Sequence, residues 1–296
     1  MGLLERLFGR SKTSGSRPAD GGQQKESGAG AEREQAREKE EPLKEAEREI
    51  SLQVGNIQGV GDREQQEDSF AVLNSSDPER RRSQGLLAMV ADGMGGMADG
   101  KAASQLAVDV LLDRFSGWDR QQTPPEWLYG GAFAASDQVF SRSQGASGTT
   151  LTAVHIWENQ MHWLSVGDSA IFLKRGGGVF QLNREHTYLN QLYARELEEE
   201  TIDKTRAQSD ADARRLTSFV GIDHLKEVDL NLRPWILKPG DVILLCSDGI
   251  SGVLSPPELL EAMSLPPDEG CALLETMVLE KQIPEQDNYT GVMIAC

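Results

Sequence analysis

Residues 84–96, QGLLAMVADGMGG, place an apolar run directly before an aspartate and a glycine-rich turn. The run is rich in aliphatic side chains and bounded by turn residues, which predicts a strand over Gln84–Ala91. Asp92 then stands at the end of that strand, where the fold holds the backbone and can aim a side chain accurately. Taken alone, an Asp-Gly pair after a strand indicates an ordinary turn. The pattern gains meaning only because it recurs along the chain.

Acidic residues stand at predicted strand ends at four further places: Glu67 with Asp68, Asp168, Asp248 and Asp287. If these carboxylates converge, their mutual repulsion is costly unless protons or cations offset it. Oxygen ligands of this kind are the ones that Mg²⁺ and Mn²⁺ prefer. Two such ions about 3.5–4 Å apart acidify a water molecule between them and absorb charge on a phosphoryl group. The pattern therefore predicts a divalent-metal site, although convergence itself does not follow from the spacing.

The rest of the chain after residue 50 predicts short strands and longer helices. Apolar runs between turn signals predict strands over Ser69–Leu73, Thr150–Trp157, Met161–Val166, Ala170–Lys174, Asp241–Ser247 and Tyr289–Ala295. Helical periodicity and a capping box predict helices over Ala102–Phe115, Pro125–Ser141, Glu258–Met263 and Glu269–Lys281. Tight turns at Asn159 and at 176–178 indicate antiparallel pairing. Because helices fall between groups of strands, the pattern is typical of an α+β fold with helices covering sheets.

Composition argues against several classes of function. The chain has 296 residues, of which 38% are hydrophobic and 26% charged, and its formal net charge is −17. Residues 1–50 hold ten Lys and Arg against eleven Asp and Glu, so the remainder carries about −16, and such a domain repels the phosphate backbone of nucleic acids. Three unpaired cysteines argue against a disulfide framework, and the four histidines lack the spacing of zinc ligands. With no apolar stretch of about 18 residues and no signal-peptide pattern, we expect a cytoplasmic protein.

Residues 1–50 differ from the rest and are predicted to form a disordered or helical charged tail and linker. Within residues 1–10, four apolar side chains share one face at helical spacing: Leu3, Leu4, Leu7 and Phe8. Residues 11–30 are rich in Gly, Ser and Gln, as flexible linkers are, and residues 31–49 are almost entirely charged or polar. The tail is either a simple tether or a means by which residues 1–10 dock on a partner or a membrane surface.

Six short segments follow one another along the chain: Gly61–Ser69, Val90–Gly96, Ser147–Thr150, Val166–Ser169, Cys246–Gly249 and Asp287–Asn288. Together they resemble the motif series of the type 2C metal-dependent serine/threonine protein phosphatases, particularly the bacterial branch. The resemblance runs from about residue 53 to 296 and implies that residues 51–296 form a catalytic domain. It also implies a four-layer α-β-β-α sandwich, in which two mainly antiparallel sheets pack face to face and the metals lie at one end.

The same resemblance implies a set of metal ligands. Asp92 would bridge two ions, Mg²⁺ or Mn²⁺, and Gly93 would offer its carbonyl oxygen to one of them. Asp248 and Asp287 would complete one site, and Glu67 would serve the other.

Further roles follow from the same motifs. Asp68 would orient a metal-bound water, and Asp168 together with Asp248 would hold a third, weaker ion. Arg63 would grip the substrate phosphate as a fork-shaped donor, a role that lysine fills less well. Met94 stands where eukaryotic members carry a histidine proposed as general acid, so water would have to protonate the leaving group.

The implied function is the hydrolysis of phosphoserine and phosphothreonine on proteins by a water activated between two divalent metals. The protein would then act in signal transduction, with phosphoproteins as substrates and a serine/threonine kinase as its opponent. One alternative is a catalytically silent regulator that keeps the fold and binds a signalling partner. Another is a phosphatase restricted to a single regulatory protein. Retention of the implied ligands favours an enzyme, whereas the flap segment 182–216 is too unusual to predict a substrate preference.

Overall fold

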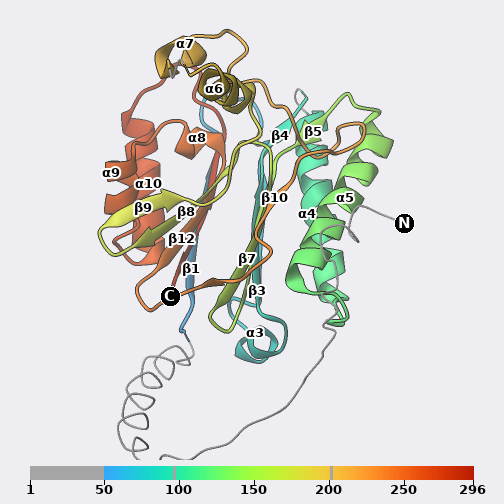
Figure 1. Ribbon diagram of the computed structural model, residues 1–296. Helices are drawn as coiled ribbons and strands as arrows, with labels where there is room; N and C mark the ends of the chain where they lie inside the picture. Colours follow the sequence, from blue (N-terminus) through green and yellow to red (C-terminus); the bar gives the residue numbers. More distant parts are fainter. Residues whose placement is uncertain (1–49, 96–97, 201–202) are drawn as a thin grey trace, which may run out of the picture. The chain divides into compact units, whose positions relative to one another are not determined.

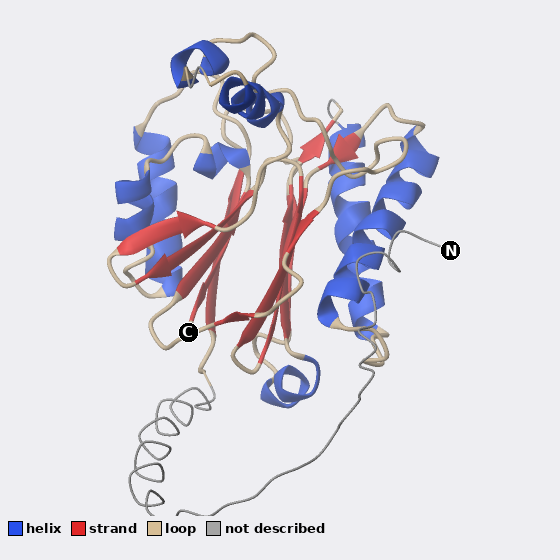
Figure 2. Cartoon of the chain, in the orientation of Figure 1, coloured by secondary structure: helices blue, strands red, loops and turns tan. Residues whose placement is uncertain are grey.

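The computed structural model describes residues 50–95, 98–200 and 203–296. The predicted tail, including the amphipathic segment 1–10, therefore lies outside the described residues except for Ile50. Two antiparallel sheets occupy the centre of the described part, and helices cover the outer face of each (Figures 1 and 2). The predicted α+β sandwich of four layers is confirmed.

The first sheet has five strands in the order β1-β13-β12-β8-β9, and every neighbouring pair is antiparallel. Its strands are β1 (Gln53–Gly59), β8 (Ala170–Arg175), β9 (Gly178–Gln181), β12 (Val242–Cys246) and β13 (Tyr289–Ala295). Strand β1 pairs along its whole length with β13, the last strand of the chain. The loops that follow β1 and precede β13 are therefore neighbours at one edge.

The second sheet has the order β10-β7-β6-β3-β2, and β11 also pairs with β7. Its strands are β2 (Ser69–Leu73), β3 (Leu86–Ala91), β6 (Leu151–Trp157), β7 (Gln160–Val166), β10 (Asp229–Leu230) and β11 (Trp235–Ile236). Every residue of β3 is buried, which explains its unbroken apolar sequence. A short ladder of β4 (Gly93–Met94) with β5 (Gly148–Thr149) continues directly beyond β3.

The helices of the described ranges lie on the outside of the sheets and at both of their ends, with α6 and α7 at one end and α3 at the other (Figure 1). They are α3 (Pro78–Gln84), α4 (Ala98–Ser116), α5 (Pro124–Ser143), α6 (Tyr188–Glu198), α7 (Lys204–Gln208), α8 (Asp248–Ser251), α9 (Pro256–Ala262) and α10 (Pro267–Glu280). Helices α4 and α5 pack on the second sheet, and α9 and α10 pack on the first.

Strand β3 shows how one sequence fills two cores. Its residues Leu87 and Met89 face α4 and α5, whereas Leu86 and Val90 face the other sheet. This division follows from the two-residue period of a strand, which sends successive side chains to opposite faces. A third core lies between the first sheet and α9 and α10. Three apolar layers thus hold the two sheets in place. The residues at the ends of the strands are held in place with them.

Several predicted boundaries are confirmed, and a few are wrong. Strand β13 has the predicted range. Gln84 was predicted to begin a strand, but it is the last residue of helix α3, which was not predicted. Asp77 caps that helix by accepting hydrogen bonds from two backbone N–H groups. Helix α4 begins at Ala98, not at the predicted Ala102. The prediction began too late because the first turn of the helix carries no apolar stripe. Strand β1 was also missed, because glycines interrupt its alternation. None of the helices in the described ranges is both long enough and apolar enough to span a bilayer.

Candidate metal centre

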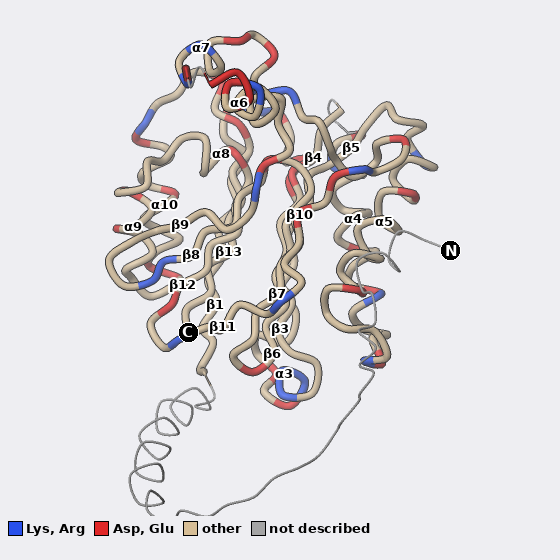
Figure 3. The backbone as a smooth tube through the Cα atoms, viewed as in Figure 1, with Lys and Arg blue, Asp and Glu red and all other residues tan. Residues whose placement is uncertain are grey.

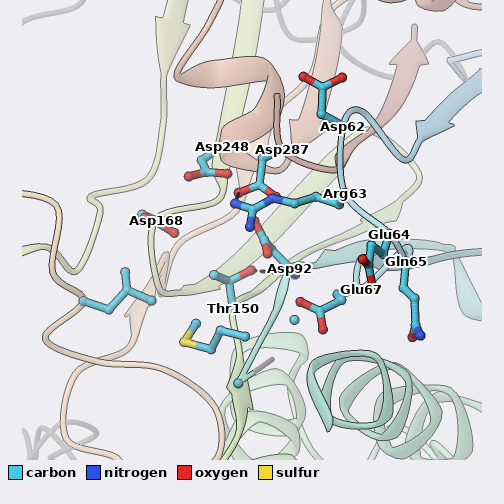
Figure 4. Close-up of a pocket in the computed structure, with 14 residues that line it drawn as sticks. Asp62, Arg63, Glu64, Gln65, Glu67, Asp92, Thr150, Asp168, Asp248 and Asp287 are labelled. Carbon is cyan, nitrogen blue, oxygen red and sulfur yellow. Dashed lines mark hydrogen bonds and ion pairs between the residues drawn. The ribbon is translucent and has the colours of Figure 1, made fainter. Parts of the chain in front are cut away.

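A pocket of about 660 Å³ lies at the end of the sandwich where strands of both sheets finish. Figure 4 shows Asp92 near its centre, with Asp248 and Asp287 on one side and Glu67 on the other. The pocket is lined by nearly all the residues that the sequence singled out, namely Arg63, Glu67, Asp92, Gly93, Asp168, Asp248 and Asp287. Asp68 is the exception, because it is fully buried behind the pocket wall. Figure 3 shows acidic residues of both sheets meeting at this end, below α6.

Asp92 is held through its backbone by two threonines of the facing strand. Its N–H donates to Thr150 Oγ1 at 2.9 Å, and its carbonyl accepts from Thr150 N at 2.9 Å and from Thr149 Oγ1 at 2.8 Å. The carboxylate is thereby aimed into the pocket. Burial raises the pKa of Asp92 well above its ordinary value, and the neighbouring negative charges, first that of Asp68, raise it further.

Three chain segments pack closely together at Glu67, namely those that carry Glu67, Gly93 and Gly100. A Cβ at Gly93 would overlap the carbonyl oxygens of Gly100 and Glu67, and a Cβ at Gly100 would come within 2.9 Å of the Glu67 carboxylate. Only glycine fits at position 93, where the clash is with backbone, whereas a side chain at position 100 would displace the Glu67 carboxylate. Burial raises the pKa of Glu67, while the charge of Arg63 opposes that shift. Its Oε1 is buried and has no hydrogen-bond partner, so it is available to a cation.

Asp68 is supported from the opposite sheet. Ser247 Oγ donates to its Oδ2 at 2.9 Å, and its N–H donates to Gln66 Oε1 at 2.8 Å. Burial raises the pKa of Asp68 to about 6, and hydrogen bonds from Thr290 and Ser247 limit the rise. Its second oxygen, Oδ1, is buried without a partner.

Asp248 begins α8 directly after β12, and Asp287 directly precedes Asn288 and β13. Burial raises the pKa of Asp248, and the charge of Asp287 adds to the effect. A hydrogen bond with Asp92 and the charges of Arg214 and Arg63 oppose it. Arg63 Nη2 lies 2.8 Å from Asp287 Oδ2, in an ion pair whose side chains are 55% and 45% exposed. The residue predicted to grip phosphate is therefore paired with a predicted metal ligand at the mouth of the pocket.

Asp168 occupies the short connection between β7 and β8 and lines the same pocket. Burial raises its pKa to about 7, and the charges of Asp248 and Glu185 contribute to the increase. The structure thus brings Asp168 into the carboxylate cluster.

The residues present fit a divalent cation of the Mg²⁺ or Mn²⁺ type. The donors are all oxygens, several of them have raised pKa values from burial and mutual repulsion, and two buried carboxylate oxygens lack partners. Within the described ranges, no three His, Cys, Asp or Glu side chains already form a closed shell around one point. The carboxylates are spread around the pocket wall, which agrees with repulsion that a bound cation would relieve.

Four supporting residues were not assigned roles from the sequence. Lys101 Nζ donates to the carbonyl of Asp68 at 2.6 Å and to Ser69 Oγ at 2.9 Å. Asn288 Oδ1 accepts from Glu67 N at 2.7 Å, and its amide donates to the carbonyls of Val60 and Gln65. The other two are Thr149 and Thr150. Asn288 and the threonines stood inside recognised motifs, which is the signal that could have found them.

Comparison with known proteins identifies the family. Residues 66–278 match the model of the protein phosphatase 2C family, and the chain belongs to it. The serine/threonine protein phosphatase PstP of Mycobacterium tuberculosis is 33% identical over 184 residues, which are 61% of this chain. The serine/threonine phosphatase stp of Listeria monocytogenes is 28% identical over 209 residues, covering 68% of this chain and 78% of that protein.

Solved structures give the same answer for the fold. The catalytic domain of PstP in complex with two manganese ions matches with a TM-score of 0.65 and 25% identity, over 82% of this chain and 97% of that one. The matched segment spans only 34% of the full-length PstP. The relatives named here are serine/threonine protein phosphatases.

Proposed function

We propose that residues 51–296 form a catalytic domain that hydrolyses phosphoserine and phosphothreonine on proteins in a metal-dependent reaction. One observation carries the proposal: acidic residues from five separate parts of the chain line a single pocket with an arginine at its mouth. Phosphate monoesters resist uncatalysed hydrolysis so strongly that electrostatic stabilisation must supply most of the acceleration. A pocket of this composition supplies it once cations are bound.

Two ions, Mg²⁺ or Mn²⁺, would when bound lower the pKa of a water molecule and neutralise charge developing on the phosphoryl group. We assign their ligands to five positions, namely Glu67, Asp92, the carbonyl of Gly93, Asp248 and Asp287. Asp92 has the central position, since it lies between the other acidic side chains (Figure 4). Asp168, beside Asp248, would hold a third and weaker ion.

Arg63 would bind the substrate phosphate. Its guanidinium offers a planar set of donors that matches two phosphate oxygens, and its side chain is exposed enough to reach them. Its present partner, Asp287, is also an assigned metal ligand. A cation on Asp287 would weaken that ion pair and leave the guanidinium free for the substrate, so metal and phosphate binding would support each other.

Asp68, directly behind the pocket wall, would orient a metal-bound water by accepting a hydrogen bond from it. The side chain is held from behind by Ser247, and its free Oδ1 provides the acceptor. Met94 lines the pocket but has no proton to give. A water molecule would therefore protonate the leaving alkoxide of serine or threonine.

We further propose that an opposing serine/threonine kinase produces the phosphoprotein substrates and that the protein acts in the cytoplasm. The proposal for residues 1–10, docking on a partner or a membrane, stays a prediction, as does the tethering role of the tail. Retention of Glu67, Asp92, Asp248 and Asp287 in one pocket supports an enzyme over a catalytically silent regulator.

The test is turnover of a panel of phosphoserine and phosphothreonine peptides, together with p-nitrophenyl phosphate, by metal-stripped protein. We expect hydrolysis after addition of Mn²⁺ or Mg²⁺ and none in EDTA. Full activity in EDTA would exclude the metal-dependent reaction. Cleavage of p-nitrophenyl phosphate alone, with no turnover of any peptide, would argue for a substrate restricted to one regulatory protein.

A further inference from the structure

A second, smaller pocket shares a wall with the candidate metal centre. It has a volume of about 230 Å³, and Asp62 lines both pockets. Small-molecule sites are typically about 300–1,000 Å³, so this pocket has the size of an amino-acid side chain rather than of a cofactor. Its position beside the phosphate-binding arginine makes it a candidate for substrate recognition.

The lining of the second pocket is mainly apolar. Its apolar residues are Val60, Val278, Leu279, Ile283 and the ring of Tyr289. Three of them are exposed, Val60 at 41%, Leu279 at 52% and Ile283 at 38%. Single exposed apolar residues are common on proteins, but here three gather around one hollow on a strongly acidic chain. Asp62 is the only charged residue in the lining.

Asp62 is turned away from the metal centre and is already engaged. Its Oδ2 accepts from Gln286 N at 3.0 Å, and its own N–H donates to the Gln286 carbonyl at 2.8 Å. Figure 4 shows its side chain pointing away from the other carboxylates. Two hydrogen bonds therefore hold the shared wall in place, and one oxygen of its carboxylate is bound to backbone.

The distance between the two pockets is set by a single turn. Arg63 N donates to the carbonyl of Val60 at 3.3 Å, so Val60 and Arg63 are the first and last residues of a four-residue turn. The Cα atoms at the ends of such a turn lie less than about 7 Å apart. An extended peptide advances about 3.3 Å per residue. Since the Arg63 side chain adds its own length to that of the turn, we take the separation of the bound phosphate from the apolar pocket as about 7–13 Å, which two to four extended residues span.

We propose that this pocket is a subsite for an apolar side chain of the phosphoprotein substrate, two to four residues from the phosphorylated serine or threonine. The inference rests on the proposed phosphatase activity, because the phosphate anchors the substrate beside the pocket. The proposed occupant is the substrate chain rather than a second copy or the tail, since Asp62 lines both this pocket and the one that would hold the phosphate. The enzyme then selects substrates by an apolar neighbour as well as by the phosphate.

The test uses a phosphothreonine peptide of Gly and Ala carrying a single leucine at each position from four before to four after the phosphoresidue. We expect leucine at one or more positions two to four residues away to raise kcat/KM about tenfold, as burial of an apolar side chain allows. Leu279→Gln should remove most of that gain. The matched control, Leu265→Gln, changes another exposed leucine outside the pocket and should keep it.

Hydrolysis of p-nitrophenyl phosphate separates this inference from the proposed function, because that substrate has no neighbouring residues. Both leucine variants should cleave it at the wild-type rate. Equal turnover of all peptides by the wild type, or a leucine preference that persists in Leu279→Gln, would overturn the subsite. A change in oligomeric state on Leu279→Gln with an unchanged preference would also overturn it and would assign the pocket to a second copy. Absence of any turnover with Mn²⁺ would instead refute the proposed function.

Discussion

The hydroxyl of Ser247 donates a hydrogen bond of 2.9 Å to Oδ2 of Asp68, joining two residues that lie 179 positions apart in the sequence. Ser247 follows β12 of the first sheet, and Asp68 precedes β2 of the second. The same hydroxyl oxygen accepts the N–H of Thr290 at 2.9 Å. The candidate metal pocket is therefore tied to the packing of the two sheets, and a change in one sheet alters a carboxylate carried by the other.

Replacing Ser247 by alanine should weaken both stability and metal binding. The Thr290 N–H loses its partner and Asp68 loses a donor, and a buried unsatisfied group costs about 1–3 kcal/mol. Urea unfolding of metal-stripped protein measures the first effect, and calorimetric titration with Mn²⁺ measures the second. Ser251→Ala is the control, because it removes a serine hydroxyl that donates to a backbone carbonyl. Wild-type values for Ser247→Ala on both measurements would contradict this role.

Asp168→Asn should stabilise the metal-free protein at pH 8. Its pKa in the folded state, about 7, lies above the ordinary value of 3.8, so its contribution to stability is complete below about pH 4 and is lost as the pH rises through 7. Removing the charge should therefore recover on the order of 1–2 kcal/mol at pH 8, since partial exposure screens part of the effect. Urea unfolding at pH 8 and pH 4 measures it, and the difference should vanish at pH 4. Equal stability of the two proteins at pH 8 would show that burying the charge of Asp168 beside other carboxylates costs nothing.

Arg63→Lys should raise KM for phosphopeptides. A lysine keeps the charge but cannot donate to two phosphate oxygens in one plane, and a charge-assisted hydrogen bond is worth about 1.5–3 kcal/mol. We expect kcat/KM to fall about tenfold or more, with p-nitrophenyl phosphate affected as well. Arg80→Lys, on the exposed helix α3, serves as the control. An unchanged KM would contradict a role for Arg63 in phosphate binding and would leave its ion pair with Asp287 as its established contact.

Acid should destabilise the protein through His155. This side chain is fully buried and its Nε2 lies 2.7 Å from the carbonyl of Gln84. Burial lowers its pKa to about 4, although the bond to Gln84 opposes the shift. Because the folded-state pKa lies below the ordinary 6.5, protons bind the unfolded chain first. Stability from this group is therefore complete above pH 6.5 and falls by about 3 kcal/mol as the pH decreases to 4.

The variant His155→Gln keeps a donor for the Gln84 carbonyl but does not titrate. Its unfolding free energy should vary less between pH 6.5 and pH 4 than that of the wild type. Since both proteins share all other titrating groups, the difference between their slopes isolates His155. Identical slopes would show that another group accounts for the acid sensitivity.

The parts of the fold that could be predicted from the sequence are those in which an unbroken apolar run marks a buried strand. The apolar run before Asp92 and the strand Tyr289–Ala295 were recognisable because nearly every residue of these two strands is buried. Strand β1 was missed because Gly55 and Gly59 interrupt its pattern, and their role is close packing against Pro267 and Tyr289.

The site was predictable in part for the same reason. Acidic residues at strand ends, together with ordered motifs, indicated which side chains belong to the pocket. What the sequence could not show were contacts between distant segments. The bonds of Lys101 to Asp68 and Ser69, and of Ser247 to Asp68, depend on how α4 and the two sheets pack. The pairing of Arg63 with Asp287 is of the same kind, as is the wall that Asp62 shares between two pockets.

The central claim is that Asp92 holds the catalytic metals. Its most direct test is turnover of p-nitrophenyl phosphate by the wild type and by Asp92→Asn across a titration of Mn²⁺, with circular dichroism to verify that both are folded. The amide keeps the shape and relieves repulsion, so the variant should fold. We predict metal-dependent turnover by the wild type and a loss of about a thousandfold or more in kcat/KM for the variant at every concentration of Mn²⁺. Wild-type turnover by Asp92→Asn, or turnover by the wild type that does not respond to Mn²⁺, would contradict the claim.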